Sequence, residues 1–449
     1  MRDGATLGST LHIDAGPSAL GSSLIVGAGP AALQVAVHLG NAGCCDSLGL
    51  ATRKGSRGDK LQEELAADGY KLTANTQPGA KAHLGGEVNL DYYYSTFDQV
   101  EDRWHTLILC TPSDSYLDVL DKMQISGKRA VRTIVLISPG IGSNLLVQHR
   151  LRDTHPSIEV ISFSTYYAAT KLEGHSLTVC RTKAFKKRIY IGSNRRGSSS
   201  TEQLRRLLER LGIGCTTVDS PLEAESRGIT SYVHPPLFLN DFSLTEIFRE
   251  RRSTKFLYKL YPEGPITQHA IKAMVLLWCE ISELVTAMGA QPINLLQFLN
   301  DDNYPVHDIT LSREDIEKFP QFDFVKQQYL LYIRYTAILI DPFSTPDARG
   351  KYFDFSAVPY QQVVRDHDGK WLVPRIPFED YNRLKLLRAL ARRLELAVPQ
   401  MTALIECFDK HWHAFIDKHG TDTMSREMFC DTSEADAEAI WREWGGSRL

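Results

Sequence analysis

The first half of the chain alternates short apolar runs with segments of helical periodicity. Six apolar runs predict β-strands, at residues 23–27, 48–52, 106–110, 133–138, 158–163 and 188–192. Most of them are apolar at several consecutive positions, which is typical of strands covered on both faces. Helical patterns lie between them, at 30–43, 114–123 and 143–151. Strands that alternate with helices predict an α/β fold built on a doubly wound parallel sheet.

The second half has a different pattern, in which long amphipathic helices dominate. Helical periodicity is clearest at 270–289, 324–340 and 380–396. The change predicts a flexible extension over 1–22, an α/β domain over 23–220 and a mainly α-helical domain over 221–449. The extension has no apolar core that would suit a signal peptide. The polar residues after about 420 are expected to lie at the periphery.

Composition removes several classes of partner. The 449 residues include 51 basic and 54 acidic side chains, for a formal net charge of −3. This balance gives no electrostatic reason to expect nucleic acid or an anionic membrane, and no apolar run approaches the roughly 18 to 20 residues of a membrane span. The eight cysteines form no C-x-x-C pair, which indicates reduced thiols in a cytoplasm rather than a zinc site or disulfide framework.

The segment IVGAGPAALQVAVHL follows the first predicted strand and opens a helix. Its G-x-G-x-x-A pattern permits a tight turn, a close backbone approach to a pyrophosphate, and close packing of the helix on the strand. A glycine turn can occur without a ligand, but this position favours dinucleotide binding. The residues of the predicted turn are Gly27, Ala28, Gly29, Pro30 and Ala31, with Ala32 as the third small residue.

The end of the second predicted strand indicates which nicotinamide cofactor would bind. An acidic residue there would bond the adenosine ribose of NAD, whereas this strand ends in Thr52, Arg53 and Lys54. A basic, hydroxyl-rich cluster suits a 2′-phosphate through charge-assisted hydrogen bonds. The sequence therefore predicts NADPH in preference to NADH, although a solvated basic loop would give the same pattern.

Two further strand ends are expected to line the cofactor cleft, because ligands of open α/β sheets bind at the carboxyl edge. Thr111 and Pro112 follow the strand at 106–110, and Ser138 and Pro139 end the strand at 133–138. The alternative is that these segments only cap the helices that follow them.

The stretch SYVHPPLFLNDFS places His234 directly before two prolines. Proline biases the residue before it towards extended backbone, so we expect His234 to be extended and held in one direction. An imidazole can carry a proton near neutral pH. The other interpretation is a structural histidine at the domain junction.

Long segments of the chain resemble the opine metallophore dehydrogenases, a bacterial branch of the opine dehydrogenases. The segments are VGAGPAALQVAVHL, VISFSTYYAATK, SYVHPPLFLNDFSL, YKLYPEGPIT, INLLQFLNDDNYPV, YTAILIDPFS and YFDFSAVP, and the resemblance covers about residues 23–415. It implies an N-terminal Rossmann domain, a helical C-terminal domain, an active site in the cleft between them, a homodimer and no metal in the enzyme.

The resemblance also implies a reaction. The primary amine of a histidine-derived aminobutyrate intermediate would condense with a 2-keto acid, either pyruvate or 2-oxoglutarate. NADPH would then deliver a hydride to the imine carbon, which gives a metal-chelating, nicotianamine-like opine.

Opine dehydrogenases use a histidine with a nearby carboxylate, and the candidates in this sequence are His234 and Asp341. The histidine would protonate the carbinolamine oxygen as it leaves. A carboxylate bonded to the other ring nitrogen would fix the tautomer and stabilise the charged ring. Asp341 could instead end the helix before Pro342.

Substrate carboxylates and amines need cationic, hydroxyl or amide partners. Packing is the alternative role for each tyrosine among the candidates, and a solvated helix charge is the alternative for the arginine. The candidates are Tyr166, Asn240, Asp241, Tyr261, Asn303 and Arg334.

Ala169 is a separate candidate for the keto acid site, because some relatives have an acidic residue at this position. A small apolar residue would remove a negative charge and leave room for 2-oxoglutarate, although pyruvate would still fit.

Two other functions also suit the sequence. One is a different two-domain NADPH-dependent reductase of the 2-keto or 2-hydroxy acid type, and the other is a non-catalytic NADPH sensor.

Overall fold

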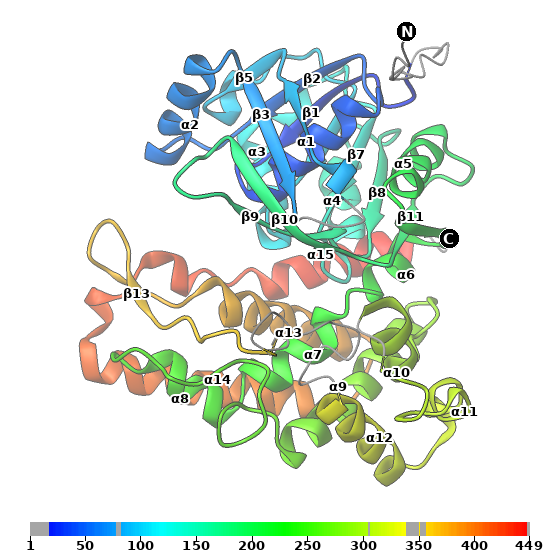
Figure 1. The fold of residues 1–449 in the computed structure, drawn as a ribbon, viewed down its shortest axis with the longest axis vertical. Helices are drawn as coiled ribbons and strands as arrows, with labels where there is room; N and C mark the ends of the chain where they lie inside the picture. The colour runs from blue at the N-terminus through cyan, green and yellow to red at the C-terminus, as the bar shows by residue number, and fades with distance from the viewer. Residues whose placement is uncertain (1–17, 78–81, 304–305, 338–349, 351–355, 447–449) are drawn as a thin grey trace, which may run out of the picture.

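The computed structural model describes residues 18–77, 82–303, 306–337, 350 and 356–446. An α/β part, blue to green in Figure 1, occupies the upper half of the molecule, and a mainly helical part lies below it. One predicted site residue, Asp341, lies outside the described residues.

Six parallel strands form the centre of the α/β part, in the order β5-β2-β1-β6-β7-β8. Each of the six predicted strands is present, so the prediction of a doubly wound α/β fold is confirmed. The last predicted strand pairs antiparallel with β8 and carries one further strand parallel to itself, so one edge of the sheet is not part of the parallel array. The strands are β1 (Ser22–Val26), β2 (Ser47–Ala51), β5 (Tyr92–Tyr94), β6 (Thr106–Leu109), β7 (Thr133–Leu136), β8 (Glu159–Phe163), β11 (Arg188–Ser193) and β12 (Gly214–Thr217).

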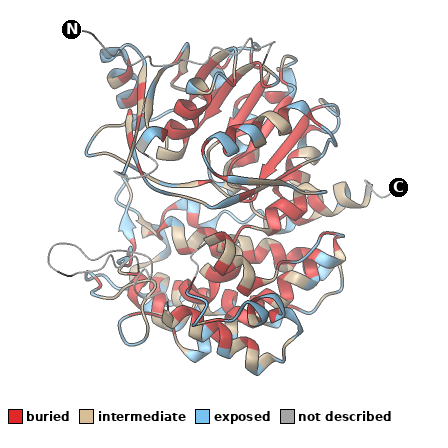
Figure 2. Cartoon of the chain, turned by 45° about the vertical axis from the view of Figure 1, so that its right-hand side comes forward, coloured by how far each residue is buried: buried red, intermediate tan, exposed pale blue. Residues whose placement is uncertain are grey.

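Helices cover both faces of this sheet, and the central strands are buried (Figure 2). Ile25 and Ile108 pack in a core with α1 (Pro30–Asn41), α2 (Ser56–Ala67) and α5 (Ser199–Arg210). Their sequence neighbours Leu24 and Leu107 pack on the opposite side with α3 (Tyr116–Lys122) and α4 (Ser143–Leu151). Successive side chains of a strand point to opposite faces, so the apolar runs fill two cores at once.

A second, four-stranded sheet packs against α1, and the sequence pattern did not predict it. Its order is β4-β3-β10-β9. Only Leu72 and Ala74 of β3 are fully buried, because this sheet has one covered face and polar residues on the other. The strands are β3 (Lys71–Thr76), β4 (Gly86–Asn89), β9 (Ala168–Leu172) and β10 (Val179–Phe185).

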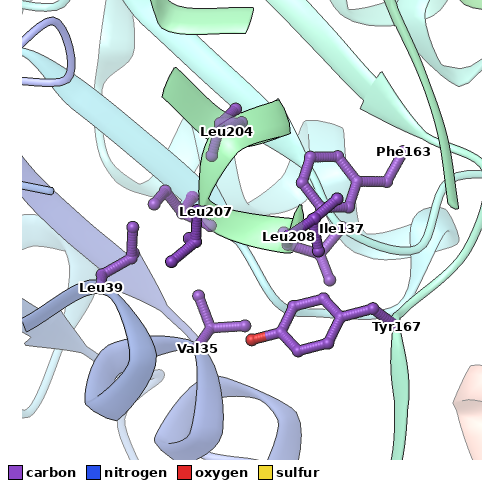
Figure 3. Close-up of a pocket in the computed structure, with 9 residues that line it drawn as sticks. Val35, Leu39, Ile137, Phe163, Tyr167, Leu204, Leu207 and Leu208 are labelled. Atoms are coloured by element: carbon purple, nitrogen blue, oxygen red, sulfur yellow. The ribbon is translucent and has the colours of Figure 1, made fainter. Parts of the chain in front are cut away.

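An apolar void lies inside the first core, between the central sheet and α5 (Figure 3). Val35, Leu39 and Leu204 contribute to its lining. Tyr167 also lines it, and its hydroxyl lies 3.0 Å from Nδ1 of the buried His38. The lining offers no charged group that could bind a polar substrate, so this void is a feature of core packing.

The helical part is built around α9, which packs against α7, α12 and α14. The predicted helices at 270–289, 324–340 and 380–396 correspond to α9, α12 and α13. No helix among the described residues is long and apolar enough to cross a membrane. The helices are α6 (Pro221–Ser226), α7 (Thr230–Phe238), α8 (Asp241–Phe248), α9 (Gln268–Ala287), α10 (Leu295–Gln297), α11 (Arg313–Glu317), α12 (Phe324–Ala337), α13 (Arg375–Arg393), α14 (Pro399–His419) and α15 (Ser433–Gly446), with a π-helical turn at Phe298–Asn303 and a short hairpin of β13 (Val364–Arg365) and β14 (Trp371–Leu372).

The prediction of a peripheral C-terminal tail is wrong. Helix α15 packs against α13 of the helical part and against α4 of the α/β part, and Figure 1 shows it in red at the boundary between the two. Ile440 is fully buried and reaches Gly142, where an added Cβ would come within 2.8 Å of its Cδ1. The polar composition of the tail concealed one narrow apolar face, which is enough to bind a helix across two neighbours.

Candidate active site

The predicted dinucleotide-binding turn joins β1 to α1 in the expected way. Gly27 has a φ of +130°, and an added Cβ would lie 3.3 Å from the carbonyl oxygen of Cys110. Both the backbone angle and the close approach of the β6 end therefore require glycine. At Gly29 an added Cβ would meet no atom within 4 Å. Open space thus lies at the start of α1, which has no side-chain cap, so the first-turn N–H groups can face a pyrophosphate there.

The basic cluster at the end of β2 lies beside this turn. Arg53 and Lys54 are exposed, and the guanidinium of Arg57 donates to the carbonyl oxygen of Ala28 at 3.3 Å. Thr52 is buried instead, and its hydroxyl lies 3.2 Å from that of Tyr93. The two exposed cations and Arg57 can therefore meet a phosphate, whereas Thr52 has a partner within the protein.

The carboxyl ends of β6 and β7 line the same edge of the sheet. The hydroxyl of Thr111 is buried and has no hydrogen-bond partner in the part of the chain that the structure describes. Pro112 precedes a 3-10 turn at Ser113–Ser115, and Ser138 and Pro139 follow β7. Below them, the Ser143 hydroxyl accepts from the amide of Gly140 at 2.9 Å. The orphaned Thr111 hydroxyl and the open start of α1 fit a dinucleotide lying along this edge, since buried polar groups normally have partners.

Helix α13 brings cationic and acidic groups from the helical part to this edge. Arg383 donates to the Ser113 hydroxyl at 3.3 Å and also to Glu379. Its Nε is buried without a partner among the described residues. Ile376 is non-helical, with φ −104° and ψ 116°, so the regular helix begins just before Glu379. A helix start favours negative charge, and here Glu379 and Asp380 already occupy it, so Arg383 is the cationic group at this place that an anionic substrate would meet.

His234 and Asp380 form a histidine–carboxylate pair. Nδ1 of His234 lies 3.5 Å from Oδ2 of Asp380, whose side chain is only 2 % exposed. This separation suits an ion pair but is longer than a typical hydrogen bond. Asp380 stands one helical turn before Arg383 on α13. The pair therefore lies next to the groups that reach the strand ends, and Nδ1 facing the carboxylate leaves Nε2 for other contacts.

The expectation that His234 has extended backbone is wrong. The residue lies inside α7, and both Pro235 and Pro236 are within the same helix. The bias that proline places on the residue before it is weaker here than the packing of α7, whose Tyr232, Leu237 and Phe238 are buried. The Phe238 ring contacts the imidazole edge to face, with centroids 4.8 Å apart. The ring is held in one direction by this packing rather than by stiff local backbone.

The remaining candidates among the described residues have partners of their own or are exposed, and Asp241 pairs with Lys410 and His411 of α14. The Asn240 side chain caps α8 by accepting from the Ser243 amide at 2.9 Å, and it also donates to two carbonyls of α7. Tyr261 is 65 % exposed. Asn303 accepts from Lys186 at 3.2 Å and donates to the Phe298 carbonyl, so it joins the two parts of the molecule.

Two other candidates are occupied elsewhere, and a third is exposed. The Tyr166 hydroxyl bonds Gln34 and lies 2.9 Å from the Thr170 hydroxyl, so it links β9 to α1. Arg334 is 2 % exposed and donates to the Leu299 carbonyl at 2.9 Å, which differs from a solvated helix charge. Ala169 is exposed on β9, opposite Ala184 of β10.

Sequence reasoning missed Asp380, Arg383 and Glu379. They stand in the segment RIPFEDYNRL, whose periodicity indicates a helix and nothing more. Charged residues three apart on a helix have an ordinary interpretation as a solvated face. The start of a regular helix at Pro377, which places acidic residues in the first turn, is the signal that could have distinguished these residues from a solvated helix face.

The comparisons with known proteins place the chain in a family. Residues 21–444 match the family model for staphylopine dehydrogenase. The chain is 43 % identical over 412 residues to the pseudopaline synthase of Pseudomonas aeruginosa, covering 92 % of this chain and 94 % of the relative. It is 37 % identical over 365 residues to the staphylopine synthase of Staphylococcus aureus, covering 81 % and 84 %.

Solved structures agree with this assignment. The NADP⁺-bound structure of yersinopine dehydrogenase superposes with a TM-score of 0.89 at 35 % identity, covering 95 % of this chain and 99 % of that one. Octopine dehydrogenase in complex with NADH and agmatine shares the fold alone, with a TM-score of 0.61 at 13 % identity. The predicted resemblance is confirmed, and the chain belongs to the staphylopine dehydrogenase family of opine metallophore dehydrogenases.

Proposed function

We propose that this protein is an NADPH-dependent opine dehydrogenase that joins a histidine-derived aminobutyrate intermediate to a 2-keto acid. The observation that carries the proposal is the His234–Asp380 pair beside Arg383, at the strand edge where the cofactor would lie. The family supports the same conclusion, because its relatives are named pseudopaline, staphylopine and yersinopine synthases. The resulting opine would chelate a metal ion outside the enzyme.

The side chains of this site would assist the loss of water. After the amine attacks the keto carbon, the carbinolamine oxygen must take a proton to leave as water. His234, held by Asp380, can give that proton from Nε2, and general acid help of this kind contributes roughly 10² to 10⁴ in rate. When bound, the nicotinamide supplies a hydride to the imine carbon. Arg383 can pair with the keto acid carboxylate through charge-assisted hydrogen bonds.

The cofactor is proposed to be NADPH, with the residues of the β1–α1 turn around its pyrophosphate. Arg53 and Lys54 would meet the 2′-phosphate, since both are exposed beside the turn. Thr111, Pro112, Ser138 and Pro139 would border the cofactor at the strand edge. The yersinopine dehydrogenase structure with NADP⁺ supports this choice of cofactor.

We also propose domain boundaries and a cellular location. We assign 23–220 to cofactor binding and 221–449 to substrate binding, which agrees with the start of the helical part at α6. The N-terminal extension ends before residue 22, because Leu20 is fully buried. A cytoplasmic location agrees with a reaction that consumes NADPH and with eight cysteines that form no disulfide.

The homodimer is proposed to form through one face of α12. Val325, Tyr329 and Tyr332 stand three to four residues apart on that helix and are exposed, with Val325 at 73 %. Exposed apolar residues at helical spacing mark an interaction surface. Val325→Glu with Tyr329→Glu should convert a dimer to a monomer in sedimentation velocity, while equal masses for variant and wild type would refute this face.

The test of function is a reconstituted reaction. NADPH oxidation is followed with the histidine-derived aminobutyrate and either pyruvate or 2-oxoglutarate, and the product is identified by mass spectrometry. We expect no oxidation when the amine is omitted. Oxidation with the keto acid alone would instead indicate a simple 2-keto acid reductase, and no oxidation with any pair would indicate a sensor.

The keto acid preference is tested at Ala169. Ala169 is exposed on β9, where a substrate can reach it. If Ala169 faces the keto acid, Ala169→Asp should lower kcat/KM for 2-oxoglutarate more than for pyruvate, because the added charge repels the second carboxylate. An unchanged ratio would remove Ala169 from the site.

A further inference from the structure

Three side chains that can bind a metal meet near the surface of the helical part. Asp241 opens α8, while Cys407 and His411 face it from α14. One ligand atom of each lies within 4.8 Å of the other two. The Asp241 carboxylate pairs with Lys410 and His411 of α14, whereas the catalytic pair proposed above joins α7 to α13. The cluster therefore lies on different elements from the proposed catalytic pair.

The cluster has ordered geometry. Cys407 and His411 are four residues apart on α14, so both side chains lie on one face. Nε2 of His411 lies 3.0 Å from Oδ1 of Asp241. The Phe248 ring stacks on the imidazole with centroids 6.4 Å apart and an angle of 15°, and the imidazole is 18 % exposed. Packing therefore directs the Nε2 atom at the carboxylate.

We propose that Asp241, Cys407 and His411 bind one divalent transition-metal ion of the zinc class, with water as the fourth ligand. Thiolate, imidazole and carboxylate are the donors that Zn²⁺ takes in tetrahedral sites. Ca²⁺ and Mg²⁺ prefer sites made only of oxygen. The mixed donor set therefore selects a borderline metal over the hard cations.

Two features of the cluster set the conditions for binding. The ammonium of Lys410 lies 3.1 Å from the same carboxylate oxygen of Asp241. Its side chain is 73 % exposed, so it can swing into solvent when a metal arrives. The thiol must lose its proton.

A second group of possible ligands differs from the first because its members are neighbours in the sequence. Asp366, His367 and Asp368 also come within 4.8 Å of one another, but they are consecutive residues of the turn between β13 and β14. An Asp366 carboxylate oxygen already accepts from the amides of Asp368 and Lys370, at 3.0 and 2.8 Å. This group is a hairpin turn with carboxylate capping, and it serves as a control.

The bound metal would clamp α8 to α14. Asn240, the cap of α8, also bonds the Pro236 and Leu237 carbonyls of α7. A metal at Asp241 would therefore hold the helix that follows the His234 segment. The expected effect is a higher unfolding temperature when Zn²⁺ is added, since an ion that binds only the folded state stabilises it.

The experiment measures metal binding by the full-length protein with NADPH present. Zn²⁺ affinity is determined by competition with a chromophoric chelator, and Co²⁺ is used as a spectroscopic probe. We expect about one ion per chain and a thiolate-to-cobalt charge-transfer band in the near ultraviolet. Cys407→Ser should abolish the band, and Cys407→Ser and His411→Ala should each weaken Zn²⁺ binding by at least about tenfold, since changes around a metal's ligands alone cost about 10- to 100-fold.

Matched variants decide the outcome. Cys430→Ser removes an exposed thiol outside the cluster, and His367→Ala removes a ligand of the hairpin group, so both should bind Zn²⁺ like the wild type. Lys410→Gln should bind more tightly. The proposal is overturned if no ion binds, or if the cobalt band survives Cys407→Ser in a protein that circular dichroism shows to be folded.

Discussion

At the residue scale, the proposed site contains several buried polar atoms without partners. Among the described residues these include Thr111 Oγ1, Asn382 Oδ1 and Arg383 Nε. An unsatisfied buried group costs about 1–3 kcal/mol, so several of them on α13 and at one strand end need an explanation. Substrate and cofactor would supply their partners. The folded protein therefore leaves hydrogen-bonding groups at this site unpaired, and a bound substrate and cofactor would pair with them.

The His234–Asp380 pair makes the first prediction. His234→Asn should lower kcat by about 10² to 10⁴ while the Kd for NADPH stays near its wild-type value, because the imidazole acts on the substrate oxygen. Stopped-flow turnover and fluorescence titration with NADPH measure the two quantities. The control is His367→Asn, at a side chain that is 88 % exposed. A variant with normal turnover would show that another group gives the proton.

The buried His38 makes a prediction about pH. Burial lowers its pKa to about 4, against an opposing hydrogen bond to the Leu84 carbonyl. The folded protein thus holds the ring neutral, while the unfolded chain takes up a proton below about pH 6.5. The stabilising effect is present above about pH 6.5 and is lost as the pH falls towards about 4.

Urea unfolding checks this at several pH values. Between about pH 7 and pH 4 the wild type should lose about 3 kcal/mol more than His38→Gln, following about 1.4 kcal/mol for each pKa unit. Glutamine keeps a donor and an acceptor but cannot be charged. Equal losses for the two proteins would contradict the assignment of a neutral imidazole.

At the scale of elements, the proposed cofactor contacts and the acids of α13 lie near the ends of helices and strands. The start of α1 faces open space, the end of β2 exposes Arg53 and Lys54, and the start of regular helix in α13 carries Glu379 and Asp380. Chain ends of this kind expose N–H groups and helix dipoles. Buried apolar residues in the interiors of α1 and β2 hold these ends in place.

The β2–α2 connection makes a prediction about cofactor choice. Arg53→Ala combined with Lys54→Ala should raise the Kd for NADPH by about 100-fold or more and leave the Kd for NADH within about twofold, because two charge-assisted bonds of about 1.5–3 kcal/mol each are lost. Isothermal titration measures both. Arg195→Ala with Arg196→Ala, on the far loop before α5, is the control pair. Equal losses for the two cofactors would contradict contact with the 2′-phosphate.

Helix α15 makes a prediction about stability. Ile440 is fully buried where α15 meets Gly142, so Ile440→Ala should cost about 2–5 kcal/mol of unfolding free energy. Ile309→Ala makes the same chemical change at a side chain that is 97 % exposed. It should change stability by less than about 0.5 kcal/mol. Similar costs for the two variants would mean that α15 does not bind as described.

At the scale of the whole molecule, several contacts join the α/β part to the helical part. Both Glu225 carboxylate oxygens accept backbone amides at the start of α4, from Gly142 and Asn144 at 2.8 Å. The Tyr190 hydroxyl donates to Asp302 at 2.8 Å, and Arg383 reaches Ser113. Together with α15 these contacts fix the relative position of the two parts, and the proposed site lies where they meet.

This linkage predicts that the molecule unfolds as one unit. Calorimetry should show a single transition, and NADPH at about 100 times its Kd should stabilise the whole chain by about 2.7 kcal/mol. The measurement is repeated with Asp302→Asn, which weakens one of the contacts. Two separate transitions in the wild type, of which only one moves with NADPH, would contradict cooperative unfolding.

The sequence by itself determined the features that depend on neighbouring residues. The central strands, the glycine turn at Gly27 and Gly29 and the basic end of β2 each follow from local patterns, because strand periodicity, positive φ and charge at a strand end are properties of a few consecutive positions. The same holds for the long helices. His234 was also identified from its own segment and the resemblance that the segment carries.

Only the tertiary structure decided which distant residues meet. Asp380 and Arg383 come to the site because α13 packs beside α7, and no periodicity specifies that neighbour. The small sheet escaped prediction because its strands bury one face only, and α15 because its apolar face is narrow. His234 is helical despite Pro235 because burial of α7 outweighs a local backbone preference. Contacts between remote segments depend on the sum of packing over the whole chain, which no short stretch of sequence contains.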